Sequence, residues 1–212
     1  PVRKQTLEWL RQQSLIVMPF MAGGKDYGYP ALLIAPRNAA FFAAALADLQ
    51  ELVPRDQLAE GYTPRGIIYV APPFRHTHFN GKQIVVHNRS ETLHEVFSYN
   101  LYPGPSAKKG VYSMLLDIGE SEGWTTLHAS TVKIITPYEN ILIIMHEGAS
   151  GGGKSEMIEQ IHRQPDGSVK IAENIVTGEE VVIQLRESSE LMPITDDMAM
   201  CPAALQQEQG KL

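Results

Sequence analysis

One glycine-rich segment constrains the fold and the chemistry of this chain more than any other feature. It matches the pattern G-x-x-x-x-G-K-[ST] and comprises Gly148, Ala149, Ser150, Gly151, Gly152, Gly153, Lys154 and Ser155, which we call the glycine loop. The apolar run 141–145 precedes it, and a helix-compatible run, 154–162, follows it. A strand, a glycine-rich turn and a helix in this order are typical of a phosphate-binding site.

Each part of the glycine loop has a chemical reason. Glycines allow successive backbone N–H groups to turn toward a phosphate without a Cβ in the way, and the start of the next helix adds partial positive charge. Lys154 is placed to reach the β- and γ-phosphates, and the Ser155 hydroxyl is placed to ligate Mg²⁺. The alternative is a flexible glycine turn that carries a Lys-Ser pair by chance. The flanking strand and helix favour phosphate binding.

A phosphate site of this kind also needs a carboxylate near the metal. Asp196 and Asp197 directly follow the apolar run 191–194, so they are the obvious candidates. A carboxylate at a strand end can hold Mg²⁺ or its water, and a second can act as a base toward an incoming hydroxyl. The alternative is that the two aspartates simply begin a helix.

The rest of the chain alternates between apolar runs typical of strands and segments with helical periodicity. This pattern predicts a mixed α/β (α+β) protein. We expect helices over 4–13, 38–53, 90–99, 108–117 and 154–162. We expect strands over 14–20, 31–35, 66–71, 83–87, 126–135, 140–145, 168–172, 181–185 and 191–195.

Length and composition narrow the class of protein. The chain has 212 residues, which allows one large domain or two small ones. A formal net charge of -6 argues against a general nucleic-acid binder. The longest apolar runs are far shorter than the roughly 20 residues that span a bilayer, so we expect no membrane partner. The one cysteine, Cys201, cannot form an internal disulfide and fits a cytoplasmic protein.

Five motifs occur in a specific order between residues 102 and 197. They are Tyr102-Pro103-Gly104, Lys108-Lys109-Gly110, Leu127-His128-Ala129-Ser130, the glycine loop and Asp196-Asp197. This order resembles the signature of ATP-dependent phosphoenolpyruvate carboxykinases. The glycine loop followed by Glu156 also resembles HPr kinase/phosphorylase, which shares the nucleotide-binding core.

The resemblance implies a carboxykinase-like architecture and a role for each matching residue. Lys109, His128 and Asp197 would ligate a catalytic Mn²⁺, Lys108 would lie near the substrate or the γ-phosphate, and Asp196 would hold the water shell of the metal. The implied cofactors are ATP or GTP, Mg²⁺ and Mn²⁺, and the implied substrate is a keto acid. Without the resemblance, Lys108-Lys109 is a solvated helix start and His128 a core histidine.

The sequence departs from the carboxykinase pattern in several places. Ala129 replaces the cysteine of the family's His-Cys-Ser motif, and Met198-Ala199 replaces the Glu-His after the aspartate pair. The family's Gly-Arg-Ser-Pro-Lys segment is missing, and Arg65 and Arg75 are the nearest candidates for its substrate-binding arginine. Two other functions therefore stay open. One is a kinase for a hydroxyl acceptor, with Asp196 or Asp197 as base and His128 holding it, and the other is a nucleotide-binding regulatory module.

We expect two regions, a mixed α/β region over 1–122 and a nucleotide-binding region over 123–212. The second region is expected to be truncated at its C-terminal end, so that the chain is a fragment. The oligomeric state stays open. His76 and His78 form an H-x-H pair that would share one face of a strand and suggests zinc, but the sequence places no companion ligand nearby. We therefore expect a polar loop over 75–78.

Overall fold

The computed structural model describes residues 1–58, 61–158, 163–184, 189–202 and 204. The chain forms two compact units, Pro1–Trp124 and Thr125–Leu212. Helices and strands are mixed in the first unit, and the second is built mainly from strands among its described residues. The expected mixed α+β class is therefore confirmed.

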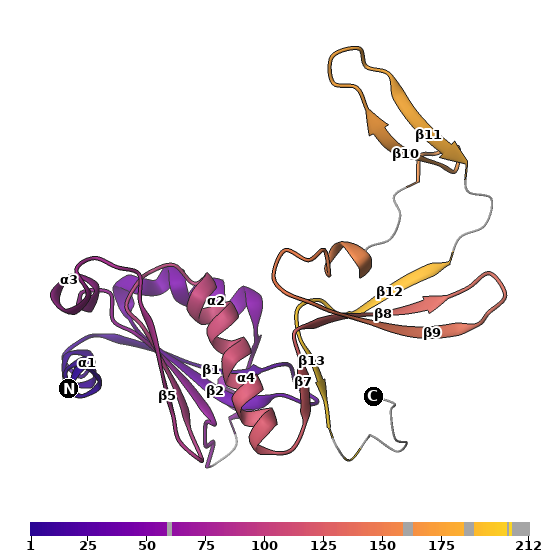
Figure 1. Ribbon diagram of the computed structural model, residues 1–212. Helices are drawn as coiled ribbons and strands as arrows, with labels where there is room; N and C mark the ends of the chain where they lie inside the picture. The colour runs from indigo at the N-terminus through magenta and orange to yellow at the C-terminus, as the bar shows by residue number, and fades with distance from the viewer. Residues whose placement is uncertain (59–60, 159–162, 185–188, 203, 205–212) are drawn as a thin grey trace. The chain divides into compact units, whose positions relative to one another are not determined.

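The first unit is organised around a six-stranded sheet, of which Figure 1 labels β1, β2 and β5. The strand order is β3-β1-β2-β4-β6-β5. Its strands are β1 Leu15–Ala22, β2 Tyr29–Pro36, β3 Glu51–Leu52, β4 Gly66–Val70, β5 Val85–Arg89 and β6 His94–Ser98. Its α-helices are α1 Val2–Leu10, α2 Ala40–Leu49, α3 Phe74–Phe79 and α4 Lys109–Ser121. Shorter helical turns are η1 Arg37–Ala39, η2 Arg55–Gln57 and η3 Gly104–Lys108. Strands β2, β4 and β6 are parallel, and the other pairings in this sheet are antiparallel.

Helices cover both faces of the central strands. Helix α4 approaches β4 so closely that a Cβ on Gly66 would collide with the Met114 side chain, which would have to move to make room for it. On the opposite face, Leu10 of α1 belongs to a buried cluster with Tyr69, Phe97 and Tyr99. Strands buried on both faces are the general result when helices cover a parallel sheet.

All five residues of β6 are buried, including the polar pair His94 and Glu95. His94 Nδ1 shares a hydrogen bond of 2.8 Å with Asp117 Oδ2 on α4. The Arg3 guanidinium on α1 donates two hydrogen bonds of 2.7 Å to Glu95. Alternate side chains thus face the two helix layers, and each buried polar group has a partner. The predicted helix over 90–99 is wrong, since residues 94–98 form a strand. This strand can be buried on both faces because His94 and Glu95 have polar partners on α4 and α1.

The segment after β4 also differs from prediction. Residues 75–78 belong to α3 and not to a polar loop. Because side chains two positions apart diverge on a helix, His76 and His78 do not share one face, and the H-x-H zinc geometry is absent there. Asn38 was expected to begin a long helix, but it lies within η1 and makes no capping hydrogen bond to α2.

The described residues of the second unit form three small antiparallel sheets. One has the order β12-β8-β9, with β8 Ala129–Ile135, β9 Ile141–Glu147 and β12 Glu190–Thr195. The others pair β7 Thr125–Leu127 with β13 Ala199–Cys201, and β10 Ser168–Glu173 with β11 Glu180–Gln184. A short 3-10 helix, η4, spans Glu156–Ile158. Among the described residues of the whole chain, no helix is both long and apolar enough to cross a membrane.

Candidate functional site

The glycine loop leaves the end of β9 and turns back toward the sheet. Gly151 and Gly153 have φ angles of +80° and +79°, in a region that other residues rarely adopt. The Gly152 N–H donates to the Ala149 carbonyl at 3.1 Å, which closes a tight turn. A Cβ on Gly152 would lie 3.1 Å from that same carbonyl oxygen. The glycines are therefore required by the backbone path of this loop.

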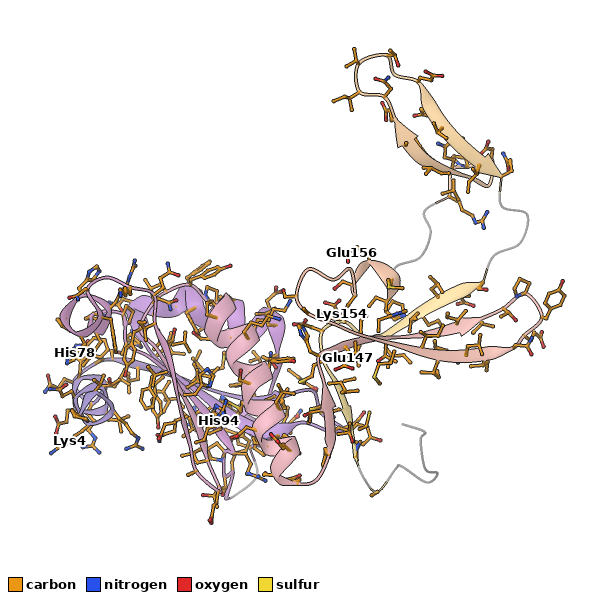
Figure 2. The ribbon with its side chains drawn as sticks, viewed as in Figure 1. Lys4, His78, His94, Glu147, Lys154 and Glu156 are labelled. Atoms are coloured by element: carbon orange, nitrogen blue, oxygen red, sulfur yellow. The ribbon has the colours of Figure 1, made fainter. Side chains whose placement is uncertain are left out.

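Lys154 points back into the loop that precedes it. Its residue is only 8% exposed, and its Nζ donates to the Ala149 carbonyl at 3.1 Å. The buried Ser130 on β8 donates from Oγ to the Lys154 carbonyl at 2.7 Å, which ties the end of the loop to the central strand. Figure 2 marks Lys154 between Glu147, at the end of β9, and Glu156. The Ala149 carbonyl therefore holds the ammonium group at the loop, and Ser130 holds the backbone of Lys154.

The segment after the glycine loop begins with a single tight turn. The Met157 N–H donates to the carbonyls of Gly153 and Lys154, both at 3.2 Å. This turn is η4, and residues 159–162 of the predicted helix over 154–162 lie outside the described residues. Ser155 is exposed at the start of the turn, where its hydroxyl is accessible to a metal ion.

His128 and Asp197 meet at a break in the sheet. His128 separates β7 from β8, and Asp196-Asp197 separate β12 from β13 on the chain that pairs with them. The two breaks face each other, and His128 Nε2 lies 3.0 Å from Asp197 Oδ1. The Gly148 N–H donates to the His128 carbonyl at 3.3 Å, so the start of the glycine loop joins the same point. Three of the motifs singled out in the sequence thus come together.

The His128–Asp197 pair is open to solvent, with side-chain exposures of 28% and 25%. The 3.0 Å contact between His128 Nε2 and Asp197 Oδ1 is a hydrogen bond, so a metal ion would have to replace it to use both side chains as ligands. Within the described residues, no group of three or more His, Cys, Asp or Glu side chains is placed to hold a metal. A metal at this pair would therefore need further ligands such as water or a lysine. Asp196 is exposed beside it.

Lys108 and Lys109 belong to the first unit. Lys108 ends η3 and Lys109 begins α4, as expected for a helix start. The Lys109 ammonium lies 5.3 Å from the centroid of the Tyr112 ring, a cation–π contact. Their assignment to the substrate and to Mn²⁺ stays a prediction.

Sequence reasoning missed the part played by Ser130 and by two threonines. Thr131 and Thr195 are register partners beside the His128–Asp197 pair, and the buried Oγ1 of each has no hydrogen-bond partner among the described residues. Ser130 stood in the quoted Leu-His-Ala-Ser motif, so its contact with the loop had a sequence signal. The threonines had none, because only strand pairing places them together.

The fold and the site define an α+β protein in which a glycine-rich, lysine-bearing loop follows a strand of an antiparallel sheet. The chain belongs to the DUF4914 family, described as a domain of unknown function, whose profile matches residues 1–212. A comparison with curated proteins gave no match. The function must therefore be argued from the site.

Proposed function

We propose that the glycine loop binds the phosphates of a nucleoside triphosphate and that the protein transfers the γ-phosphoryl group. The observation that carries this proposal is the position of Lys154, a residue that is 8% exposed and whose Nζ donates to the loop carbonyl of Ala149 at 3.1 Å. A lysine ammonium held at such a loop is a strong donor for a phosphate oxygen. The positive-φ glycines provide a backbone path that can surround such an oxygen.

The remaining loop and strand residues fit this chemistry. Ser155 would ligate Mg²⁺, which supplies charge neutralisation on the phosphates when bound. Asp196 would hold the water shell of the metal. Lys154 would stabilise the charge that builds up on the moving phosphoryl group.

The preferred reaction is carboxykinase-like, the decarboxylating phosphorylation of a keto acid. In this proposal His128 and Asp197 ligate Mn²⁺ together with Lys109, and Lys108 lies near the acceptor. The His128 and Asp197 side chains lie 3.0 Å apart, and this proximity supports a shared role for them. The architecture of the second unit would then be a carboxykinase-like nucleotide-binding region.

A second candidate function rests on the same pair. A carboxylate hydrogen-bonded to a histidine and open to solvent is suited to accept a proton from a hydroxyl group. The protein would then act as an HPr kinase-like enzyme, with Asp196 or Asp197 as base. A regulatory module would bind the nucleotide through the same loop and catalyse neither reaction.

Calorimetric titration of the full chain with ATP and Mg²⁺ tests the nucleotide site. We expect Lys154→Ala to weaken ATP binding about 100-fold, which corresponds to roughly 2.7 kcal/mol. Lys133→Ala on β8 is the matched control, because it removes a lysine from the same sheet but not from the loop. Equal affinities of the Lys154→Ala variant and the unmodified protein would contradict the assignment.

The acceptor is tested with the same full chain and three assays. A carboxykinase exchanges labelled bicarbonate into oxaloacetate when Mn²⁺ is present. A hydroxyl kinase instead transfers ³²P from labelled ATP to a protein or metabolite acceptor. ATP binding without either reaction identifies the regulatory module and overturns the proposed transfer.

A further inference from the structure

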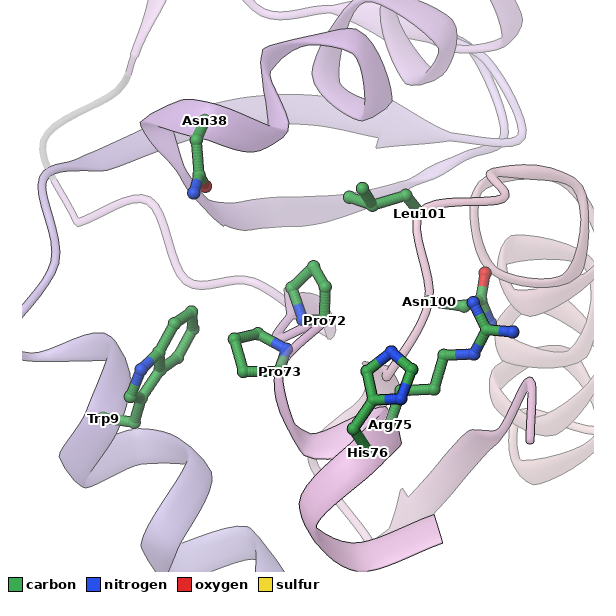
Figure 3. A pocket seen from close by; sticks show the side chains of 8 residues that line it. All are labelled: Trp9, Asn38, Pro72, Pro73, Arg75, His76, Asn100 and Leu101. Atoms are coloured by element: carbon green, nitrogen blue, oxygen red, sulfur yellow. The ribbon is translucent and has the colours of Figure 1, made fainter. Parts of the chain in front are cut away.

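Three parallel strands of the first unit end at one edge of its sheet. Strand β2 is followed by Asn38, β4 by Pro72 and Pro73, and β6 by Asn100. These residues line a single pocket of about 310 Å³, which Figure 3 shows from close by. In open α/β sheets, ligands characteristically bind outside the carboxyl ends of parallel strands. The pocket therefore lies where the sheet topology favours a binding site.

Asn100 supplies an unpartnered hydrogen-bond donor in this pocket. Its residue is only 2% exposed. Its Oδ1 accepts the Tyr102 N–H at 2.8 Å, which fixes the orientation of the amide because a backbone N–H requires an acceptor. The buried Nδ2 then has no hydrogen-bond partner among the described residues. Since an unsatisfied buried donor costs free energy, a ligand that brings an acceptor oxygen would remove that cost.

Arg75 adds a positive charge to the same side of the pocket. Its Nε donates to the Gly81 carbonyl, which holds the guanidinium group in place. Across the described part of the chain, no carboxylate forms an ion pair with it. In the view of Figure 3, Arg75 and Asn100 stand on one side of the pocket and Trp9 on the other. A guanidinium group and an amide donor together favour an anionic acceptor with more than one oxygen.

The opposite side of the pocket is apolar. Trp9 is partly buried and packs edge-on against Phe74, with ring centroids 6.0 Å apart. Pro72 and Pro73 continue this surface between Trp9 and Arg75 (Figure 3). Rigid aromatic and proline side chains offer a surface for a flat or apolar carbon group.

We propose that this pocket binds a small organic anion, a carboxylate or a phosphate ester. Its oxygens accept hydrogen bonds from Arg75 and from Asn100 Nδ2, and its carbon body lies against Trp9 and Pro72. The site belongs entirely to the first unit and does not depend on nucleotide binding by the glycine loop. No chemical step is assigned to it.

The test uses Trp9 as the reporter in the full chain. The chain has two tryptophans, so Trp124→Phe leaves Trp9 as the only indole fluorophore. Benzoate and phenyl phosphate are titrated as anionic probes, with benzyl alcohol and benzylammonium as neutral and cationic controls. We expect saturable fluorescence changes with dissociation constants on the order of 1 mM for an anion of this size, and none for the two controls. Response to benzoate, to phenyl phosphate or to both supports the site and identifies the anion class.

Two variants test whether the anionic probes bind in this pocket. Asn100→Asp retains the acceptor for the Tyr102 N–H but places a repelling charge in the pocket, and Arg75→Gln removes the guanidinium group. Each should weaken the anionic probe at least about 10-fold, while Arg55→Gln, a surface arginine outside the pocket, should not. If Asn100→Asp does not fold, Arg75→Gln on the partly exposed α3 carries the test. The absence of saturable binding, or unchanged affinity in a folded variant, overturns the proposal.

A Lys154→Ala background separates this site from the glycine loop. The Trp9 response should persist there, because the pocket uses no residue of the loop. Loss of the response in that background would assign the anion to the glycine loop and contradict a separate site. Loss of ATP binding with an intact Trp9 response would support both sites.

Discussion

The two units each contain a histidine paired with an aspartate, and the two pairs have different surroundings. In the first unit, His94 lies 2.8 Å from Asp117, and its side chain is 1% exposed. In the second, His128 lies 3.0 Å from Asp197, and its side chain is 28% exposed. His94 also shares a 2.8 Å hydrogen bond with His87, so both of its ring nitrogens are occupied. The two aspartates are similarly exposed, at 29% and 25%, so it is the burial of the histidine that distinguishes the two pairs.

The same contrast extends to the packing of the two units. The buried apolar side chains described in the second unit are Ala129, Val132, Ile158 and Ala199, whereas the first unit has a core of aromatic and aliphatic side chains. The apolar run 141–144 on β9 is exposed along its length. We infer that stability is concentrated in the first unit.

Truncation of a core side chain in the first unit should have the largest effect on stability. Phe97 is 2% exposed and stacks on Tyr69 with ring centroids 4.9 Å apart. We expect Phe97→Ala to lower the free energy of unfolding by about 3–5 kcal/mol. Ile143→Ala on β9, where the side chain is 59% exposed, should cost less than about 0.5 kcal/mol. Urea unfolding of both variants measures the difference, and equal losses would refute the contrast in packing.

Breaking the ion pair of Arg3 and Glu95 should have the next largest effect. Arg3→Ala leaves the Glu95 carboxylate, which is 2% exposed, without its cation. We expect a loss of about 2 kcal/mol in the free energy of unfolding. This is less than for a fully buried pair, because Arg3 itself is half exposed. Lys4→Ala is the matched control on the same helix. It removes an exposed pair with Glu8, at 3.8 Å, worth about 0.3 kcal/mol. A similar loss in both variants would show that burial does not decide the strength of the pair.

The effect of Arg3→Ala should depend on pH. Burial alone would raise the pKa of Glu95, but hydrogen bonds from Arg3 and Asn88 outweigh it and lower that pKa below its ordinary value. A carboxyl whose pKa is lowered on folding stabilises the protein above its unfolded pKa and loses this effect as pH falls through the folded pKa. The difference in the free energy of unfolding between the unmodified protein and the Arg3→Ala variant should therefore persist at pH 7 and shrink below about pH 4. Urea titrations across this range measure it.

Acid should also weaken the first unit through its two contacting histidines. Burial lowers the pKa of both His87 and His94, although Asp117 partly opposes this, and Arg89 adds to it. Because the unfolded chain takes up protons first, the free energy of unfolding should fall as pH drops below about 6.5, by at most about 1.4 kcal/mol per pH unit for each histidine. His94→Gln should reduce this slope, and the exposed His78→Gln should not. An unchanged slope in the His94→Gln variant would contradict the assignment.

Asp197→Asn should have only a small effect on stability. Its pair with His128 is partly exposed, so we expect a loss below about 1 kcal/mol. Under the proposed function, the same substitution should abolish phosphoryl transfer while leaving the protein folded. Asp117→Asn, which removes the partner of the buried His94, should give the opposite result, with a larger loss of stability. A comparable loss of unfolding free energy in Asp197→Asn and Asp117→Asn would contradict the larger structural role of the His94–Asp117 pair.

Local patterns predicted most of the strands but not the most buried one. The runs that became β1, β2, β4 and β9 were all expected, because each is apolar and bounded by turn residues. Strand β6 was predicted as part of a helix over 90–99, because Ser90 is a residue that can cap the start of a helix. The partners that allow it to be buried on both faces lie on α1 and α4, far away in the sequence. Helix α3 was missed because its six residues are too short to show a helical period.

The sequence by itself determined the glycine loop, because its positive-φ turns depend on local backbone sterics that only glycine satisfies. It also placed Lys154 within reach of that loop. Only the tertiary structure decided which distant groups meet, such as His128 with Asp197, 69 residues apart, and Asn38 with Arg75 and Asn100 around one pocket. The physical reason is that such contacts depend on strand pairing and on the shared edge of a sheet. No local stretch of sequence encodes that arrangement.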